Sequence, residues 1–190
     1  YDSAVGYGWS FAHDKRLFEY PDGSIVIRSG CGHRARFVLT GGAYVSASGD
    51  IAGQLFSDSN GSYEFKHVDG ARDIYSPLGQ LAAVIAPSGQ RHEYIYDARE
   101  QLPLIGTSPR AVDPNKPMLV AYLPRLTRIE ERTSNGLLTG YHVDFAYNDT
   151  TGRLTGIVAD DGRQVTYAHD LFSGATRGNL VSVSGLGNYS

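Results

Sequence analysis

The chain has 190 residues, of which 41% are hydrophobic and 19% charged, and its formal net charge is −3. This composition is typical of one large or two small globular domains, and the absence of a basic block argues against nucleic-acid binding. No apolar run reaches the roughly 18 residues that a membrane-spanning helix needs. The 13 tyrosines and 23 glycines favour β-structure, because both residue types are poor helix formers.

Residues 1–77 are predicted to form an N-terminal β-hairpin region. Pro21-Asp22-Gly23 is a strong turn signal between two segments of alternating residues, Phe11–Tyr20 and Ser24–Arg28. Further along, glycines divide the chain into short strands, and Asp69-Gly70 marks another hairpin turn. This region therefore reads as a series of short hairpins without a helix.

Residues 78–190 contain an internal repeat. The segments Gly79–Asp97 (GQLAAVIAPSGQRHEYIYD) and Gly152–Asp170 (GRLTGIVADDGRQVTYAHD) align over 19 positions without a gap, at a constant offset of 73 residues. Each copy has a short apolar strand, a turn around Gly89 or Gly162, and a second strand rich in tyrosine and β-branched residues. Each copy is therefore predicted to be a β-hairpin.

Two partial units share this pattern. Leu126-x-x-Ile129 begins one that ends at Phe145-Ala146-Tyr147-Asn148, with a hairpin six residues longer than those of the full copies. Leu180-x-x-Val183 begins a last unit, and residues 106–117, which contain three prolines, are predicted to be an inserted surface loop. The repeat-defining structural residues are Leu81, Val84, Gly89, Tyr94, Tyr96, Asp97, Leu126, Ile129, Phe145, Tyr147, Leu154, Ile157, Gly162, Tyr167, Asp170, Leu180 and Val183.

The apolar residues that open each unit have an unusual spacing for a strand. Leu81 and Val84 are three positions apart, as are Leu154 and Ile157, and residues at this spacing point to opposite faces of a regular strand. We therefore expect a sheet covered, or partly occupied, on both faces. The predicted fold class is all-β, a row of antiparallel hairpins whose edges need further repeats, self-closure or a partner chain.

These units resemble those of the Rhs/YD-repeat family, whose pattern is roughly G-x-L-x-x-[IV]-x(4)-G-x(4)-[YF]-x-Y-D. Tyr96-Asp97 matches the terminal Tyr-Asp, whereas His169-Asp170 and Tyr147-Asn148 each differ at one residue. The segments Gly6–Ser10 and Tyr122–Ile129 also resemble stretches of Rhs cores. The resemblance is good from about Leu78 to the C-terminus and looser before it.

The resemblance implies that consecutive hairpins form a segment of a curved β-sheet shell, as in Rhs proteins, Tc-toxin subunits and teneurins. In bacterial members the shell encloses a C-terminal toxin, and many are delivered by type VI secretion with a spike protein as carrier. The chain is thus expected to be a structural, non-catalytic wall segment of a protein secreted or delivered from bacteria. Its expected partners are further repeats of the same polypeptide, the toxin cargo and a spike protein. Asp113-Pro114 shares only a dipeptide with the family's Asp-Pro-x-Gly-Leu cleavage motif, so no protease role follows.

The tyrosines suggest an alternative, a glycan-binding β-repeat module. Tyrosine rings beside Asp or Asn can stack on sugar rings, and the residues in question are Tyr94, Tyr96, Tyr141, Tyr147 and Tyr167. Their recurrence in every unit favours a structural role instead, because cross-strand aromatic pairs stabilise sheets.

Cys31-Gly32-His33 suggests a second, more remote alternative, a hydrolase. Cys31 and His33 are two positions apart and share a face in an extended chain, but a catalytic pair also needs a third group that orients the base. We interpret the segment as a glycine-rich turn with a half-buried, inactive thiol. The sequence predicts no catalytic residue, no cofactor and no metal site.

Overall fold

The computed structural model describes residues 2–3, 5–7, 12–49, 52–97, 124–149, 151–170 and 179–185. Within these residues every regular element is a β-strand, which confirms the all-β prediction. Strands β1 (Asp2–Ser3) and β2 (Gly6–Tyr7) form a small sheet of their own. The predicted loop at residues 106–117 lies outside the described residues.

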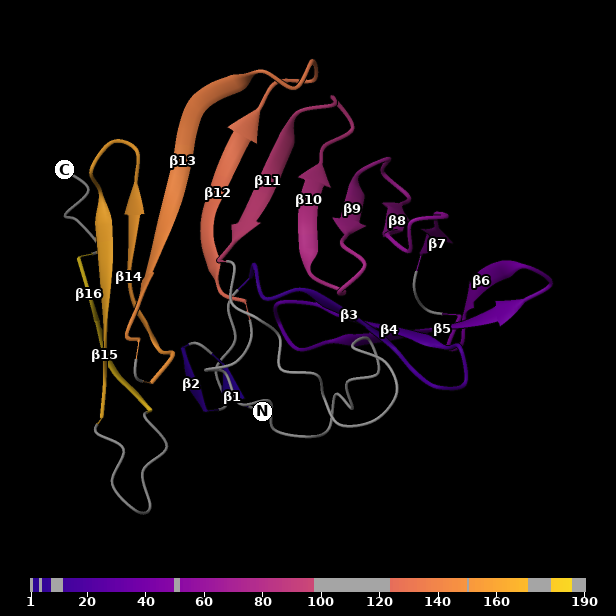
Figure 1. Ribbon diagram of the computed structural model, residues 1–190, viewed down its shortest axis with the longest axis horizontal. Helices are drawn as coiled ribbons and strands as arrows, with labels where there is room; N and C mark the ends of the chain where they lie inside the picture. Colours follow the sequence, from indigo (N-terminus) through magenta and orange to yellow (C-terminus); the bar gives the residue numbers. More distant parts are fainter. Residues whose placement is uncertain are drawn as a thin grey trace.

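The other 14 strands form one antiparallel sheet in which the spatial order follows the chain from β3 to β16 (Figure 1). Each strand therefore pairs with the next, as the prediction of consecutive hairpins requires, and residues 1–77 and 78–190 contribute to the same sheet. The strands are β3 (Arg16–Glu19), β4 (Ile25–Arg28), β5 (Arg34–Thr40), β6 (Ala43–Ser46), β7 (Gly53–Ser57), β8 (Tyr63–His67), β9 (Arg72–Tyr75), β10 (Leu81–Ile85), β11 (Arg91–Tyr96), β12 (Leu126–Arg132), β13 (Leu138–Tyr147), β14 (Leu154–Ala159), β15 (Gln164–His169) and β16 (Leu180–Ser184).

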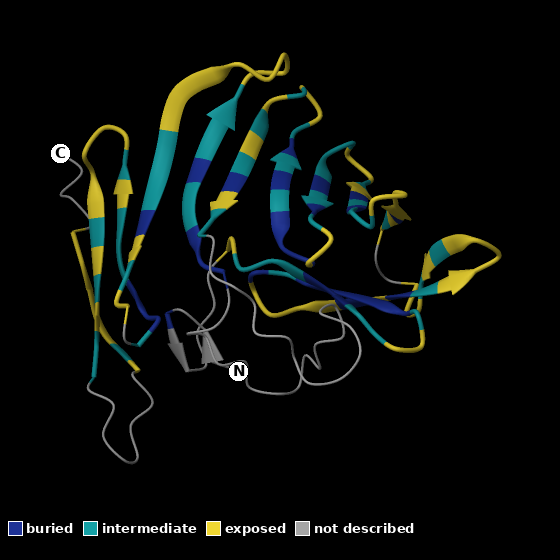
Figure 2. Ribbon diagram, in the orientation of Figure 1, coloured by how far each residue is buried: buried dark blue, intermediate teal, exposed yellow. Residues whose placement is uncertain are grey.

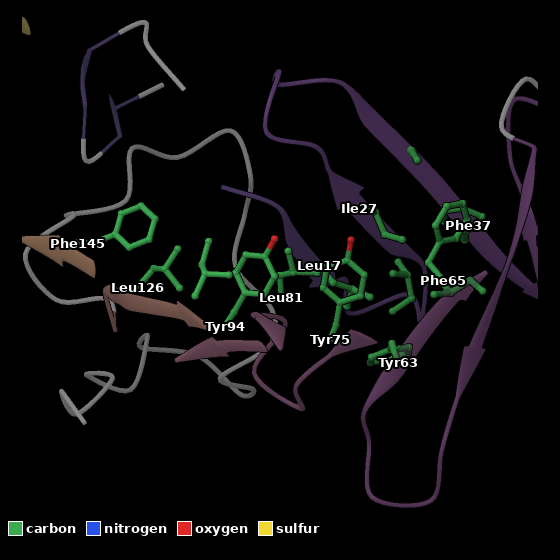
Figure 3. Packing of buried hydrophobic residues seen from close by; sticks show 14 of the residues in the cluster. Leu17, Ile27, Phe37, Tyr63, Phe65, Tyr75, Leu81, Tyr94, Leu126 and Phe145 are labelled. Carbon is green, nitrogen blue, oxygen red and sulfur yellow. The ribbon is translucent and has the colours of Figure 1, made fainter. Parts of the chain in front are cut away.

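The first strands of the sheet pack against its middle. The Leu17 amide of β3 donates a hydrogen bond to the Gly79 carbonyl just before β10, at 2.8 Å, and the rings of Phe37 and Phe65 meet edge to face at 5.7 Å. The sheet is open, since β3 and β16 are its two end strands. Figure 3 shows the resulting core as a row of side chains that runs from Phe145 past Leu81 to Phe37.

A β-bulge at the start of each unit overturns the expected placement of the apolar pair. In β14, Leu154 lies opposite Tyr147 and Ile157 lies opposite Phe145, so three positions on one strand match two on its partner. Since Phe145 and Tyr147 share a face, Leu154 and Ile157 share it too. Equivalent bulges occur where β10, β12 and β16 begin. The expectation that these residues point to opposite faces is therefore wrong.

The leucines that open the units thus lie on one side of the sheet, which we call the core face. It carries Leu81, Leu126 and Leu154, which are 0%, 5% and 0% exposed. In Figure 2, β10 is buried along most of its length, whereas the tip of the β12–β13 hairpin is exposed. Such bulges also bend and twist the strands that contain them.

The opposite side of β11–β13, which we call the charged face, carries a ladder of ion pairs. Arg132 lies 2.5 Å from Glu93 and 3.4 Å from Glu130, and Arg128 lies 2.6 Å from Asp144. Both Arg128 and Asp144 remain about 40% exposed. On these strands the second face is therefore partly occupied, by ion-paired side chains in place of an apolar cover.

Candidate functional site

The candidate site is the seam where successive units meet, and the tyrosine of Tyr-Asp forms its first part. The Tyr96 hydroxyl donates to the carbonyl oxygen of Leu81 at 3.0 Å, and the Tyr147 hydroxyl donates to that of Leu126 at 2.9 Å. In both cases the acceptor is the leucine that opens the same unit. Burial is the main cause that raises the pKa of both tyrosines, so the two hydroxyls stay protonated and act as donors.

The aspartate of Tyr-Asp forms the second part, a reciprocal pair that we call the connection clamp. The Asp97 amide donates to the Arg125 carbonyl at 2.9 Å, and the Asp97 carboxylate accepts from the Arg125 amide at 2.7 Å. The clamp fixes the two chain ends at the base of a new hairpin. It recurs between Asp170 and Asn179 and, with a serine hydroxyl, between Ser76 and Gln80.

The clamps close connections of very different length. The residues that they join are 4, 9 and 28 positions apart. In the remaining connection the Asn148 amide donates to the Arg153 carbonyl at 2.8 Å, while the Asn148 side-chain oxygen accepts from Thr151 instead. Where it is complete, the clamp therefore fixes where the next unit begins, whatever the number of residues between its ends.

Arg125 joins two neighbouring connections. Its guanidinium, only 5% exposed, reaches the carboxylates of Asp97 at 3.4 Å and Asp149 at 3.0 Å and the carbonyl of Asn148 at 3.3 Å. It also lies 5.1 Å from the centre of the Tyr147 ring, a cation–π distance. A buried guanidinium needs such a set of acceptors, so this residue links the base of one unit to the base of the next.

The structure places the predicted repeat residues in three parts of the unit: the hairpin turn, the connection at the base and the core face. Gly89 and Gly162 lie in the hairpin turns with φ values of 86° and 83°, where a side chain would be strained. Asp97 and Asp170 hold the connections. The core cluster and the side chains packed against it contain Leu81, Val84, Tyr94, Tyr96, Leu126, Ile129, Phe145, Tyr147, Leu154, Ile157 and Tyr167, while Leu180 is half-buried and Val183 is 43% exposed.

A buried polar cluster between the first and middle strands was not predicted from the sequence. Asp73 is 4% exposed and lies 2.9 Å from the Lys15 ammonium and 3.2 Å from His67. Lys15 and Asp73 are 58 positions apart, and no repeat relates them. Only the close approach of β3 to the middle of the sheet brings these groups together, so no local sequence signal could have identified the cluster.

The tyrosines of the glycan alternative do not form an exposed row. Tyr94, Tyr96 and Tyr147 are buried or half-buried in the core, whereas Tyr141 is 64% exposed near the tip of the β12–β13 hairpin. The hydroxyls of Tyr96 and Tyr147 are engaged by backbone carbonyls. The seam therefore uses these tyrosines for contacts within the sheet.

The Cys31 thiol lies in an exposed turn, so the expectation of a half-buried thiol is wrong. Its sulfur is 3.0 Å from the Ser29 hydroxyl, and this hydrogen bond, followed by one from the His33 backbone, lowers the pKa of the thiol. The contact is with the backbone of His33, so it gives the imidazole no part in activating the thiol.

Among the described residues, no group of three or more His, Cys, Asp or Glu side chains gathers as metal ligands would. The part of the chain that the structure describes also contains no helix long and apolar enough to cross a membrane. In comparisons with known proteins, no family model matches the chain. No curated protein matches it either.

Proposed function

We propose that this chain is a non-catalytic wall segment of an Rhs-type β-shell that encloses a C-terminal toxin and carries it out of a bacterial cell. The observation that carries the proposal is the seam. Each unit repeats the same bulge and a polar closure at its base, so successive hairpins pair in one direction along the sheet. Such an arrangement suits a wall that grows by adding units.

The two faces of β11–β13 support a container function. The core face is lined by apolar and tyrosine side chains, whereas the charged face carries the Arg128–Asp144 and Arg132–Glu93 pairs. The wall of a container needs one face that is compatible with water and another that is compatible with the enclosed toxin. The function follows from confinement, so the wall itself needs no catalytic group, and its partners are further units of the same polypeptide, the toxin and a spike protein.

The first test is to read the coding region on both sides of the chain. Further Tyr-Asp units, followed by an Asp-Pro-x-Gly-Leu motif and an unrelated C-terminal domain, are expected. A stop codon soon after Ser190, with no repeat upstream, would contradict the proposal and make sugar binding the next function to examine.

The second test uses the complete polypeptide. Its C-terminal domain is expected to resist a protease at concentrations that digest the same domain produced alone. Equal digestion of the enclosed and the isolated domain would show that the wall does not confine it. Electron cryomicroscopy of the complete polypeptide then locates residues 124–185 in the wall or outside it.

A further inference from the structure

Two histidine contacts join the start of the chain to strands that follow it by 80 residues or more. His13 Nδ1 lies 3.1 Å from the Tyr94 hydroxyl of β11, a pair 81 positions apart, and the two rings are 5.8 Å apart. His169 of β15 contacts the backbone of Val5. Val5 is itself 5% exposed and belongs to the same core cluster as Phe145. The start of the chain is therefore tied to the core face at both residues.

His169 is also the place where the repeat departs from its own pattern. The residue equivalent to His169 in the first copy is Tyr96, whose hydroxyl bonds the carbonyl of its own unit. The histidine contacts Val5 instead, and its Nε2 is buried without a hydrogen-bond partner among the described residues. The substitution thus replaces a contact within the unit by a titratable contact with the start of the chain.

The surroundings of both histidines favour the neutral ring. Burial, followed by the charges of His92 and Lys15, lowers the pKa of His13 below its usual 6.5. Burial also lowers the pKa of His169, with Arg153 adding to the effect; the Val5 bond and Asp170 oppose it. Protonation of His169 would in addition give the buried Nε2 a hydrogen for which the described residues supply no acceptor.

The acidic groups on the strands next to His13 already have partners. Asp73 of β9 contacts Lys15 and His67, and Glu131 of β12 lies 3.7 Å from His92. On the segment of His13 itself, Asp14 lies 3.2 Å from Arg28. Of the charged groups that act on His13, His92 and Lys15 both lower its pKa.

We propose that the His13–Tyr94 and His169–Val5 contacts form a pH-sensitive tie, which holds the start of the chain on the core face at neutral pH and releases it under mildly acidic conditions. The direction of the pH effect follows from the linkage between protonation and stability. A histidine whose pKa is lower in the folded state contributes stability that is complete above pH 6.5 and is lost as the pH falls through the folded value. Release would uncover Tyr94 and the side chains around Val5 without breaking the strand ladder.

The chain carries its own probe for this event. Its single tryptophan, Trp9, lies between Val5 and His13 in the sequence. Acrylamide quenching of Trp9 fluorescence is measured from about pH 7.5 to about pH 5.5, and we expect the quenching constant to rise about twofold or more while the far-ultraviolet circular dichroism of the sheet stays constant.

The decisive variant is the double substitution His13→Gln and His169→Tyr. Glutamine keeps a hydrogen-bonding group without titrating, and tyrosine restores the repeat pattern. The double variant should show a flat quenching profile, whereas His33→Gln, which changes an exposed histidine, should behave like the unmodified chain. A double variant with the unmodified pH profile, or an unmodified chain without a pH response, would overturn the proposal.

If the double variant does not fold, a second measurement on the unmodified chain tests the proposed tie. The ring resonances of His13 and His169 in the unmodified chain are followed by NMR as the pH falls. Their midpoints are expected below 6.5 and at the same pH as the change in Trp9 quenching. Midpoints at or above 6.5, or a quenching change at a different pH, would refute the tie.

Discussion

The bulge at the start of each unit makes an uncommon prediction about single-residue deletions. Removing Thr155 leaves Leu154 and Ile157 two positions apart, so a regular strand keeps both on the core face and only the bulge is lost. Removing Ala146 from the partner strand leaves Phe145 and Tyr147 adjacent, which forces one of them to the opposite face. Two deletions in directly paired strands should therefore have very different costs.

The magnitudes follow from the burial of the side chains. Phe145 is 6% exposed, and losing a buried aromatic side chain from a core costs about 3–5 kcal/mol. Deleting Thr155 leaves the core intact, so its cost should be about 1 kcal/mol. Thermal unfolding followed by circular dichroism measures the difference, since 1 kcal/mol corresponds to about 2–4 °C in a chain of this size. Equal losses in the two variants would show that the bulge does not reconcile the spacing.

Two further predictions concern single atoms of the seam. Tyr147→Phe removes one buried hydrogen bond and should cost about 1 kcal/mol, measured by urea unfolding. Tyr141→Phe, at an exposed position, is the control, and equal effects would mean that the Tyr147 hydroxyl contributes nothing. Gly79→Ala places a methyl group against the Leu17 carbonyl, whereas Gly23→Ala has a nearly identical φ and open space around it. Gly79→Ala should therefore lose at least about 2 kcal/mol more than Gly23→Ala, and a smaller difference would argue against the contact between β3 and the middle of the sheet.

Much of the fold could be predicted from local sequence signals. The glycine turns, the tyrosine-rich second strands and the 73-residue offset were enough to predict consecutive hairpins. The rule that side chains alternate between the two faces placed Leu81 and Val84 on opposite faces, which is wrong. The rule holds only in a regular strand, and the extra residue of a bulge shifts the alternation by one position. An apolar spacing of three at the start of a β-hairpin unit is better interpreted as a bulge signal.

The polar part of the seam could be predicted only in part. Tyr96 and Asp97 were identified as repeat residues, but their partners, the Leu81 carbonyl and Arg125, depend on which strands become neighbours. The link of Lys15 to Asp73 depends on the approach of β3 to the middle of the sheet. Such contacts between distant positions follow from the topology, which the sequence of one unit does not contain.

The connection clamp has a consequence for how this protein can change over time. Bringing the two ends of a flexible connection together costs only about 2 kcal/mol more when the ends are 28 positions apart than when they are 4 apart. The reason is that this entropic cost rises only with the logarithm of the length. The Asp97–Arg125 pair therefore lets the ladder accept new sequence at a connection without a change of register. The bases of the hairpins are the natural places for a lineage, or an engineer, to graft a foreign peptide onto this sheet.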